Sequence, residues 1–376
     1  QPFCLRVPNA EQNECGDFDA SESLRATDEK WTSKARKKYL LYEVNVGEGF
    51  NLRRDVYLRM ASIVYRLKNE NWTLVLPPFG PLYHWKSRRF QRSKLPWTLF
   101  FDIQSLNAIV PVIEFEQFLS EIGDQIDIVV ALKHFDDNFD DRWYERFEIE
   151  YCEESKSYYK LSENEVRGWF FSYFDRVTAS NLICLKIEGF TTTLKKFIRK
   201  QLSNYFSVFI SNAEVILHKN YGDSLYWSIR RSMRFNRDLI AIGDEFRAKY
   251  LNSTNIQDKT TIESDWVHMR RNHGDALGGP FLAVHIRRDD FAKSRPKDVP
   301  TLDCAKEQIF FVAKKFSLEL VFIASDMREE EWIQLTKGLF ENYNLKVFRF
   351  KNDTLLDGQV AIVDQWICAH ARVFID

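Results

Sequence analysis

Apolar strands alternate with amphipathic helices twice along this chain, and this alternation constrains the fold more than any other feature. Near the start, the apolar segment KKYLLYEV (37–44) leads through a glycine turn into a helical stretch, and a second apolar segment, TLVLP (73–77), follows. The helical stretch has apolar residues three or four positions apart, at Leu52, Val56, Met60, Ile63 and Leu67. Such a strand–helix–strand unit is the building block of a parallel sheet with helices on its faces.

A second series of the same kind begins near Pro280. We expect strands over 281–286, 318–325, 345–350 and 372–375, with helices over 304–316, 329–339 and 358–370. Because each half of the chain then has its own strand–helix–strand series, the sequence predicts an α/β protein with two Rossmann-like domains.

The other segments suggest where the domains begin and end. Residues 1–35 show no clear period and are interpreted as an N-terminal extension. We assign residues 36–225 to an N-terminal domain and residues 226–376 to a C-terminal domain. Within the first domain, residues 135–225 are aromatic and rich in Lys, and we expect irregular structure there.

Charge and hydropathy exclude two classes of protein. The 53 Lys+Arg and 54 Asp+Glu residues give a formal net charge of -1, so the chain as a whole is not a cationic nucleic-acid binder. No run of ~18 uncharged apolar residues occurs, so we expect no membrane span.

Residues 1–18 lack the basic start and apolar core of a signal peptide. Three N-x-[ST] sequons, at Asn71, Asn252 and Asn352, and an even number of cysteines nevertheless favour the secretory pathway.

The glycine turn after the first strand is the first candidate site. Gly47-Glu48-Gly49-Phe50-Asn51 opens a helix, so backbone N–H groups and the helix dipole can face a diphosphate. It is only half of a G-x-G-x-x-G pattern, because Leu52 stands where the third glycine would be. We expect the Asn51 side chain to cap the helix. The carboxylate of Glu48 is electrostatically unfavourable next to a diphosphate, which suggests that it has another role. The obvious role is that of general base for an incoming hydroxyl. The alternative is a tight turn with an exposed glutamate.

The second candidate site lies at the end of the strand 281–286. Ligands of open α/β sheets bind outside the carboxyl ends of the strands, and alternation places His285 and Arg287 on one face. Arg287 can grip a phosphate with two parallel hydrogen bonds. The alternative is a surface basic pair that forms salt bridges with Asp289 and Asp290.

Asp364, within the apolar helix VAIVDQWICAHA (360–371), is the third candidate. Its carboxylate can accept hydrogen bonds from guanine N1–H and the 2-amino group, or it can be an ordinary helix-face residue. The only D-x-D motif is Asp17-Phe18-Asp19, in the N-terminal extension, and no H-E-x-x-H or C-x-x-C motif occurs. The sequence therefore predicts no metal site.

Successive blocks of the chain resemble the GDP-fucose protein O-fucosyltransferases. From about residue 37 to 375 they run in order as KYLLYEVNVGEGFNLRRDVYLRMAS, VLPPFGPLYHW, PVIEFEQF, VHIRRDDF, FIASD and AIVDQWICAHARVFI. The resemblance implies the GT-B fold, in which two Rossmann-like domains face a cleft. It also implies GDP-fucose as donor, inversion at the anomeric carbon without a metal ion, and a location in the lumen of the endoplasmic reticulum. Within the family, the resemblance is to the branch that acts on Ser or Thr of folded thrombospondin type 1 repeats.

The resemblance also implies roles for single residues. The catalytic base of the family falls on Glu48, its phosphate-gripping arginine on Arg287, the neighbouring histidine on His285 and its guanine-binding acid on Asp364. The turn that contacts the donor falls on Gly47, Gly49, Phe50 and Asn51. In the family, a Gly-Thr and a Ser-Thr-Phe-Ser segment that also hold the nucleotide follow the last strand. The sequence ends at Asp376, so we expect either a longer native chain or weaker donor binding.

The cysteines give further expectations. The resemblance points to a Cys152–Cys184 disulfide, which would close a loop of ~30 residues and stabilise the fold by roughly 3–4 kcal/mol in the chain-entropy model. Cys368, in an apolar helix, is expected to be a buried free thiol. Cys304 is left unassigned, and a Cys4–Cys15 bridge would close the N-terminal extension.

Two other functions remain open. One is O-fucosylation of EGF-like repeats by a sister enzyme, and the other is a non-catalytic lumenal chaperone for folding repeats. Glu48 in the first turn favours the thrombospondin-repeat branch, and release of GDP with an isolated repeat would distinguish an enzyme from a chaperone.

Overall fold

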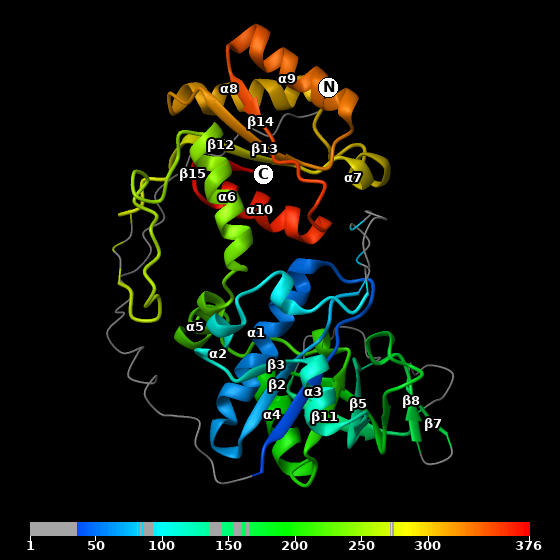
Figure 1. Ribbon diagram of the computed structural model, residues 1–376. Helices are drawn as coiled ribbons and strands as arrows, with labels where there is room; N and C mark the ends of the chain where they lie inside the picture. Colours follow the sequence, from blue (N-terminus) through cyan, green and yellow to red (C-terminus); the bar gives the residue numbers. More distant parts are fainter. Residues whose placement is uncertain are drawn as a thin grey trace. The chain divides into compact units, whose positions relative to one another are not determined.

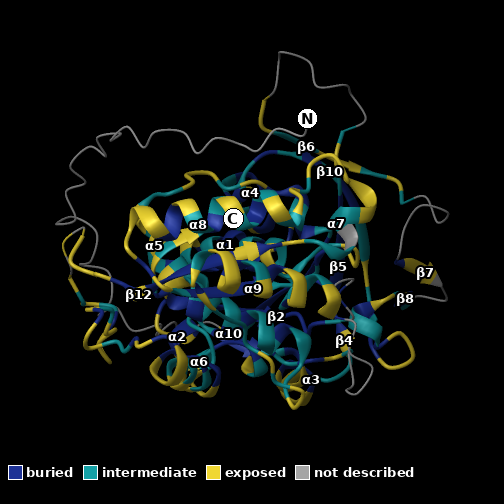
Figure 2. Cartoon of the chain, turned by 90° about the horizontal axis from the view of Figure 1, so that it is seen from above, coloured by how far each residue is buried: buried dark blue, intermediate teal, exposed yellow. Residues whose placement is uncertain are grey.

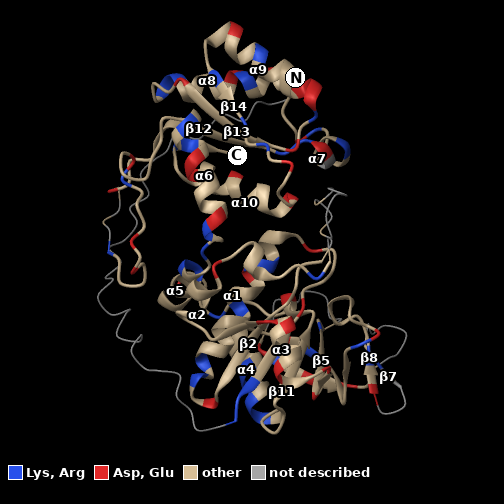
Figure 3. Cartoon of the chain, viewed as in Figure 1, with Lys and Arg blue, Asp and Glu red and all other residues tan. Residues whose placement is uncertain are grey.

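The chain folds into two compact units that meet between Asn236 and Arg237 in the sequence (Figure 1). The computed structural model describes residues 36–376, with the exception of 81, 83–84, 86–92, 136–143, 153–158, 163–164, 271 and 273. Cys4, Cys15 and the D-x-D motif at 17–19 therefore lie outside the described residues. Lys and Arg alternate with Asp and Glu over the described helices and strands (Figure 3), in keeping with the balanced charge of the sequence.

The unit that ends at Asn236 is built on a seven-stranded sheet with the order β3-β2-β1-β11-β5-β10-β6. Neighbouring strands are parallel, except that the edge strand β6 is antiparallel to β10. The strands are β1 (Lys38–Tyr42), β2 (Trp72–Leu76), β3 (Val112–Glu114), β5 (Ile128–Lys133), β6 (Arg146–Glu150), β10 (Leu182–Glu188) and β11 (Ser207–Ser211). Strands buried on both faces, such as β2 and β5, are mostly apolar, with Thr73 in β2 and Lys133 at the end of β5 as exceptions, and this is typical of parallel sheets (Figure 2).

Helices cover this sheet. In α1 (Phe50–Arg66), the predicted apolar positions Val56, Met60 and Ile63 are fully inaccessible to solvent, which confirms the helix inferred from their spacing. Residues of α3 (Phe115–Ile122) pack against Tyr39 and Leu41 of β1 in one buried cluster. The remaining α-helices of the unit are α2 (Ile103–Asn107), α4 (Thr191–Gln201) and α5 (Ser224–Ser232). A small second sheet has the order β4-β9-β8-β7, formed by Gln125–Ile126, Thr178–Ala179, Glu165–Arg167 and Lys160–Ser162.

The expectation of irregular structure over 135–225 is wrong. This stretch contributes β11 to the centre of the large sheet, β10 and β6 to one side of it, and α4 to its cover. Its regular elements were obscured because aromatic and basic residues of the connecting segments interrupt the apolar runs, and a strand of five residues leaves little periodicity to detect.

The unit that begins at Arg237 contains a four-stranded parallel sheet with the order β14-β13-β12-β15. Its strands are β12 (Gly279–Ile286), β13 (Leu320–Ser325), β14 (Lys346–Phe348) and β15 (Ala371–Ile375). Its helices are α6 (Arg237–Tyr250), α7 (Asp289–Ser294), α8 (Leu302–Lys315), α9 (Glu329–Tyr343) and α10 (Asp357–Ala369). In Figure 1, α8 and α9 lie on one face of the sheet and α6 and α10 on the other. All the strands and helices predicted after Pro280 are thus confirmed, within a few residues at their ends.

The predicted disulfide between Cys152 and Cys184 is present in the structure. Cys152 and Cys184 form a disulfide with a Cα–Cα distance of 5.3 Å. The bridge joins the end of β6 to β10, where Cys184 lies opposite Glu150 in the antiparallel ladder. Cys368 is a free thiol, as predicted, although the residue is half-buried and not fully buried as expected. Cys304 takes part in a disulfide.

None of the helices in the described part of the chain is long and apolar enough to cross a membrane.

Candidate functional site

The loop that leads from β1 into α1 presents Glu48. Two hydrogen bonds close the loop on itself: Gly47 N–H donates to Asn45 Oδ1 at 3.2 Å, and Glu48 N–H donates to the Asn45 carbonyl at 3.0 Å. Two of the N–H groups expected to face an anion are therefore satisfied within the loop. The N–H groups that remain for a ligand are those of the first turn of α1, which begins at Phe50. Glu48 itself is half-buried.

The expected capping role of Asn51 is wrong. The N-cap of α1 is Gly49, and no side chain caps it. Asn51 lies inside the first turn, is exposed, and accepts a hydrogen bond from Arg54 Nη1 at 3.5 Å. A residue two positions beyond the N-cap cannot reach the free N–H groups as an N-cap does, so its side chain is available for other contacts.

Phe50 anchors the start of α1. Its ring stacks on Phe101 with a centroid distance of 5.8 Å and an interplanar angle of 8°, and it also contacts Phe79, Trp85 and Phe100. An aromatic side chain held by four others is a fixed point for the loop that precedes it. Any contact of Phe50 with a donor substrate would therefore come from its backbone.

Arg53 connects the loop to the helix. Its Nε donates to the Glu48 carbonyl at 3.1 Å, and its Nη2 donates to the carbonyls of Asn45 and Val46 at 3.2 and 3.4 Å. From the other side, Glu214 Oε2 accepts a hydrogen bond from Asn45 N–H at 3.3 Å. Sequence reasoning missed both residues, because nothing in the spacing of LRRD distinguishes Arg53 from its neighbour Arg54.

Two half-buried carboxyl groups, those of Glu43 and Glu214, support the loop. Burial raises the pKa of Glu43, just after β1, to about 7, while Ser211 Oγ donates to its Oε1 at 2.8 Å. Burial also raises the pKa of Glu214, and the charge of the nearby Glu48 adds to this rise. Arg53 is the cation that interacts electrostatically with Glu43, Glu48 and Glu214. The loop is therefore supported by an arginine in a cluster of three carboxyl groups.

The tip of β12 carries His285 and Arg287. The two side chains are exposed and Ile286 between them is buried, which confirms that alternation places them on one face. His285 Nδ1 pairs with Asp376 at the end of β15, and the Arg287 guanidinium lies 4.1 Å from the centroid of the Phe291 ring. Arg288 plays a different part, because it forms a salt bridge with Glu331 at 2.6 Å.

The backbone at this tip is fixed by the neighbouring strand. Asp326, which follows β13, accepts hydrogen bonds from the N–H groups of Arg288 and Asp289 at 2.7 and 3.3 Å. Ser325 Oγ donates to the Ile286 carbonyl at 2.5 Å. These contacts hold the strand end from which Arg287 projects.

Asp364 is held on α10 in the same unit. Trp366 Nε1 on this helix donates to Asp244 Oδ1 of α6 at 2.7 Å. Asp364 Oδ1 is inaccessible to solvent and accepts no hydrogen bond from the described residues, and burial raises the pKa of the carboxyl to about 8. Buried polar atoms without a partner are rare in native proteins. An unpartnered acceptor of this kind suits a ligand that brings hydrogen-bond donors with it.

The helix also connects Asp364 to the tip of β12. Burial raises the pKa of the Cys368 thiol to about 12, and the charges of Asp364 and Asp376 contribute to this rise. The thiol thus lies near both carboxyl groups, and Asp376 is the partner of His285. His285 and Arg287 therefore lie at the tip of β12 and Asp364 lies on α10 of the same unit, whereas the turn 47–51 belongs to the other unit.

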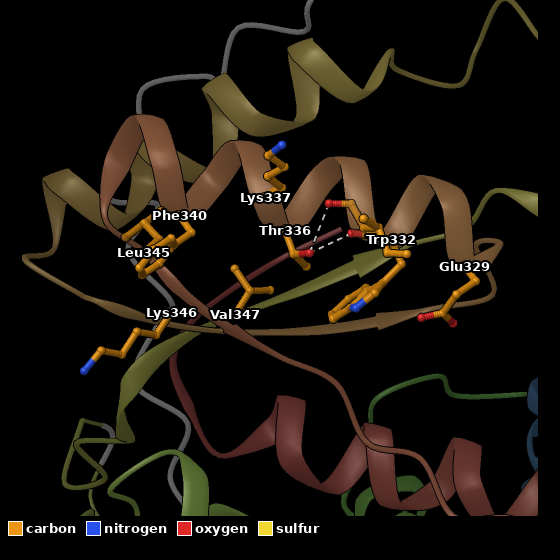
Figure 4. A pocket seen from close by; sticks show the side chains of 9 residues that line it. Glu329, Trp332, Thr336, Lys337, Phe340, Leu345, Lys346 and Val347 are labelled. Carbon is orange, nitrogen blue, oxygen red and sulfur yellow. Dashed lines mark hydrogen bonds between the residues drawn. The ribbon is translucent and has the colours of Figure 1, made fainter.

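A groove at the edge of the same sheet lies away from these residues. It has a volume of about 420 Å³ between α9 and β14, with Trp332, Thr336 and Val347 in its lining (Figure 4). Asp364 lies on α10, which covers the opposite face of the sheet. The groove is therefore not the predicted nucleotide site. Among the described residues, no group of three or more His, Cys, Asp or Glu side chains has a metal-binding arrangement.

The three sequons lie in different environments. Asn252 is exposed, and Ser253 beside it is fully buried and donates to Asp258 at 2.5 Å. Asn71 is half-buried at the start of β2. Asn352 accepts a hydrogen bond from Thr354 N–H at 2.9 Å.

Comparison with known proteins identifies the family. A sequence model described as GDP-fucose protein O-fucosyltransferase matches residues 39–376. The chain belongs to this family. It is an enzyme of the fucosyltransferase class, and its donor is GDP-fucose. Human GDP-fucose protein O-fucosyltransferase 2 is 42% identical over 344 residues, which are 91% of this chain and 80% of the human protein. The Caenorhabditis elegans protein of the same name is 42% identical over 357 residues, 93% of this chain and 82% of that protein.

A solved structure supports the fold of this fucosyltransferase. The crystal structure of POFUT1 in complex with GDP-fucose matches it with a TM-score of 0.57 and 16% sequence identity, over 90% of each chain. The mixed α/β, GT-B-like fold predicted from the sequence is thereby confirmed.

Proposed function

We propose that this fucosyltransferase transfers fucose from GDP-fucose to Ser or Thr hydroxyls of folded thrombospondin type 1 repeats, in the lumen of the endoplasmic reticulum. Transfer proceeds with inversion at the anomeric carbon and needs no metal ion. Glu48 is the general base, and Arg287 stabilises the GDP leaving group. The observation that carries this proposal is the half-buried Glu48 carboxylate at the point where β1 leads into α1, in a chain of this family.

Glu48 removes the proton of the acceptor hydroxyl as its oxygen attacks the anomeric carbon. The C–O bond to the diphosphate breaks on the opposite face of the sugar, and GDP leaves with the bonding electron pair. A base contributes to such a step only when its carboxylate is held within hydrogen-bond reach of the hydroxyl. The hydrogen bonds that close the loop at Asn45 support this role, since they restrict the backbone that carries Glu48.

Arg287 compensates the negative charge that develops on the diphosphate. A fixed cation that interacts more strongly with the transition state than with the bound substrate raises the rate. The exposure of Arg287, on a strand end that Asp326 and Ser325 hold in place, supports this assignment. Replacement of Arg287 by Ala is expected to lower kcat by ~10²–10³-fold. His285, paired with Asp376, lies beside it and contributes to donor binding.

Asp364 binds the guanine base through its carboxylate. Guanine N1–H and its 2-amino group are two donors on one edge, whereas adenine has an acceptor at N1. The Asp364 oxygen that lacks a partner supports this assignment. The first turn of α1, with Gly49 and Asn51, contributes contacts to the diphosphate.

The proposal is tested by Glu48→Gln and Glu48→Ala in a transfer assay with GDP-fucose and a folded thrombospondin type 1 repeat. We expect transfer to fall by at least ~10²-fold while the Kd for GDP, measured by calorimetry, stays largely unchanged. Glu307→Gln, which neutralises an exposed carboxylate on α8, is the matched control and should be fully active.

Three outcomes would contradict parts of the proposal. Glu48 variants that retain most of their activity would remove the base assignment. Transfer to an EGF-like repeat in place of the thrombospondin repeat would change the acceptor, and binding of folding repeats without GDP release would indicate a chaperone.

A further inference from the structure

The side chain of Arg53 donates hydrogen bonds to three different carbonyls of the loop 45–48. We propose that Arg53 is a positioning residue for Glu48: it holds the loop backbone in the one arrangement from which the carboxylate reaches the acceptor hydroxyl. This inference rests on the proposed role of Glu48 as the base. Arg53 acts through Glu48 and has no assigned contact with either substrate.

The geometry requires a guanidinium group. Nε and Nη2 diverge by a fixed angle, and the first reaches the carbonyl of Glu48 itself while the second reaches the carbonyls two and three residues earlier. A planar fork satisfies acceptors in several directions with little loss of side-chain freedom, whereas a lysine ammonium is a single point at the end of a flexible chain. The three carbonyls are therefore tied together by one rigid group.

The fork is itself anchored. Arg53 lies in the first turn of α1, where its backbone N–H donates to the Gly49 carbonyl at 3.2 Å. Phe50, three residues earlier, is held by a cluster of four aromatic rings. These contacts limit the movement of the guanidinium relative to the core. Because the guanidinium is bonded to the loop carbonyls, the movement of the loop is limited as well.

Glu214 completes the arrangement on the other side of the loop. Its Oε2 accepts the Asn45 N–H at 3.3 Å, and its charge interacts with Arg53. Glu43 and Glu48 also interact electrostatically with Arg53. Without the arginine, the repulsion between Glu48 and Glu214 would no longer be offset by the charge of Arg53, and Glu48 would move away from Glu214.

The neighbouring arginine shows that this arrangement is specific. Arg54 points elsewhere, with its Nε 3.5 Å from Met233 Sδ and its guanidinium over the rings of Phe50 and Phe235. Its Nη1 donates to Asn51 Oδ1 at 3.5 Å. Of the two adjacent arginines, Arg53 donates to the loop carbonyls, whereas Arg54 contacts Met233 and the rings of Phe50 and Phe235.

Arg53→Ala and Arg53→Lys test the inference in the full chain, with kcat and KM for GDP-fucose and the Kd for GDP as readouts. Displacement of a catalytic group by ~1 Å typically lowers the rate ~10²-fold, and we expect this fall in kcat for Arg53→Ala. The Kd for GDP should change by less than about threefold, because guanine and leaving-group binding are assigned to Asp364 and Arg287. Arg53→Lys keeps the positive charge and can donate to one of the carbonyls. Its kcat should therefore lie between that of the wild type and that of Arg53→Ala.

Chemical rescue separates positioning from a general structural role. Guanidinium added to Arg53→Ala can occupy the space of the lost group, and we expect it to raise kcat at least ~10-fold without changing the wild type. Arg372→Ala is the matched control, because Arg372 donates with Nε and Nη2 to the Gly278 carbonyl at 3.1 and 3.0 Å at the amino ends of the strands. This variant should keep wild-type kcat and show no rescue.

The outcomes distinguish the two assignments when Glu48→Gln is measured in parallel. If Glu48→Gln is inactive while Arg53→Ala keeps kcat within about threefold, the positioning role is wrong and the base assignment survives. If Glu48→Gln is active, both assignments are wrong. A fall in kcat that neither guanidinium nor lysine reverses, or that is matched by the loss of GDP binding, overturns the positioning role as well.

Discussion

Binding of GDP should release a proton from Asp364. Burial raises the pKa of this carboxyl to about 8, so at pH 7 only about one molecule in eleven carries the carboxylate in the free protein. The guanine edge presents two hydrogen-bond donors, and a carboxylate accepts from both with its two oxygens. A protonated carboxyl would instead direct its own O–H donor toward one of the two guanine donors. The bound state therefore selects the ionised form, and the proton leaves.

The magnitude follows from the population of the carboxylate. Selection of a form present at one part in eleven costs about 1.4 kcal/mol at pH 7. Between pH 7 and pH 8.5 the Kd for GDP should fall roughly eightfold, and the number of protons released per GDP should fall from about 0.9 to about 0.2. The second ionisation of a phosphate, near pH 6, is largely complete across this range and adds little.

Isothermal titration calorimetry measures both quantities. Titrations in two buffers that differ in ionisation enthalpy give the number of protons released, and the pH series gives the affinity. Asp364→Asn should bind GDP more weakly, because its amide group presents donors to donors, and its affinity should not depend on pH over this range. A wild-type Kd that stays constant from pH 7 to pH 8.5, with equal enthalpies in both buffers, would refute the reasoning.

Three further predictions concern stability and metal dependence. Glu43→Gln should raise the free energy of unfolding by about 3 kcal/mol at pH 8 and leave it nearly unchanged at pH 4, as measured by urea unfolding. The sign follows because burial raises the pKa of Glu43 from 4.5 to about 7, so the stability that its protonated form provides at low pH is lost as the pH rises through 7; equal effects at both pH values would contradict it. Replacement of both Cys152 and Cys184 by Ala should lower the free energy of unfolding by roughly 3 kcal/mol, because the bridge joins residues separated by 32 positions; an unchanged urea midpoint would argue against this. Transfer should persist in excess EDTA, and activity that disappears in chelator and returns with Mn²⁺ would show that a metal takes part.

The sequence determined the strand–helix–strand units at both ends of the chain and the location of the candidate residues on them. Spacing alone placed Val56, Met60 and Ile63 on the buried face of α1, because a helix brings residues three and four apart onto one side. It also placed His285 and Arg287 on one face at the tip of β12, because side chains alternate along a strand. These are local relations, which the chain carries wherever the segment folds.

Only the tertiary structure decided which groups hold those residues. The role of Arg53 depends on Glu214, far away in the sequence, and on a loop whose path no pattern specifies. The positions of β10 and β11 in the large sheet depend on their pairing with β5, which comes from an earlier segment of the chain. The pKa of Asp364 depends on what buries it, since the helix 357–369 by itself would leave the carboxyl in water. Contacts between distant parts of the chain produce no periodic pattern in the sequence, so they could not be predicted from it and are seen only in the folded structure.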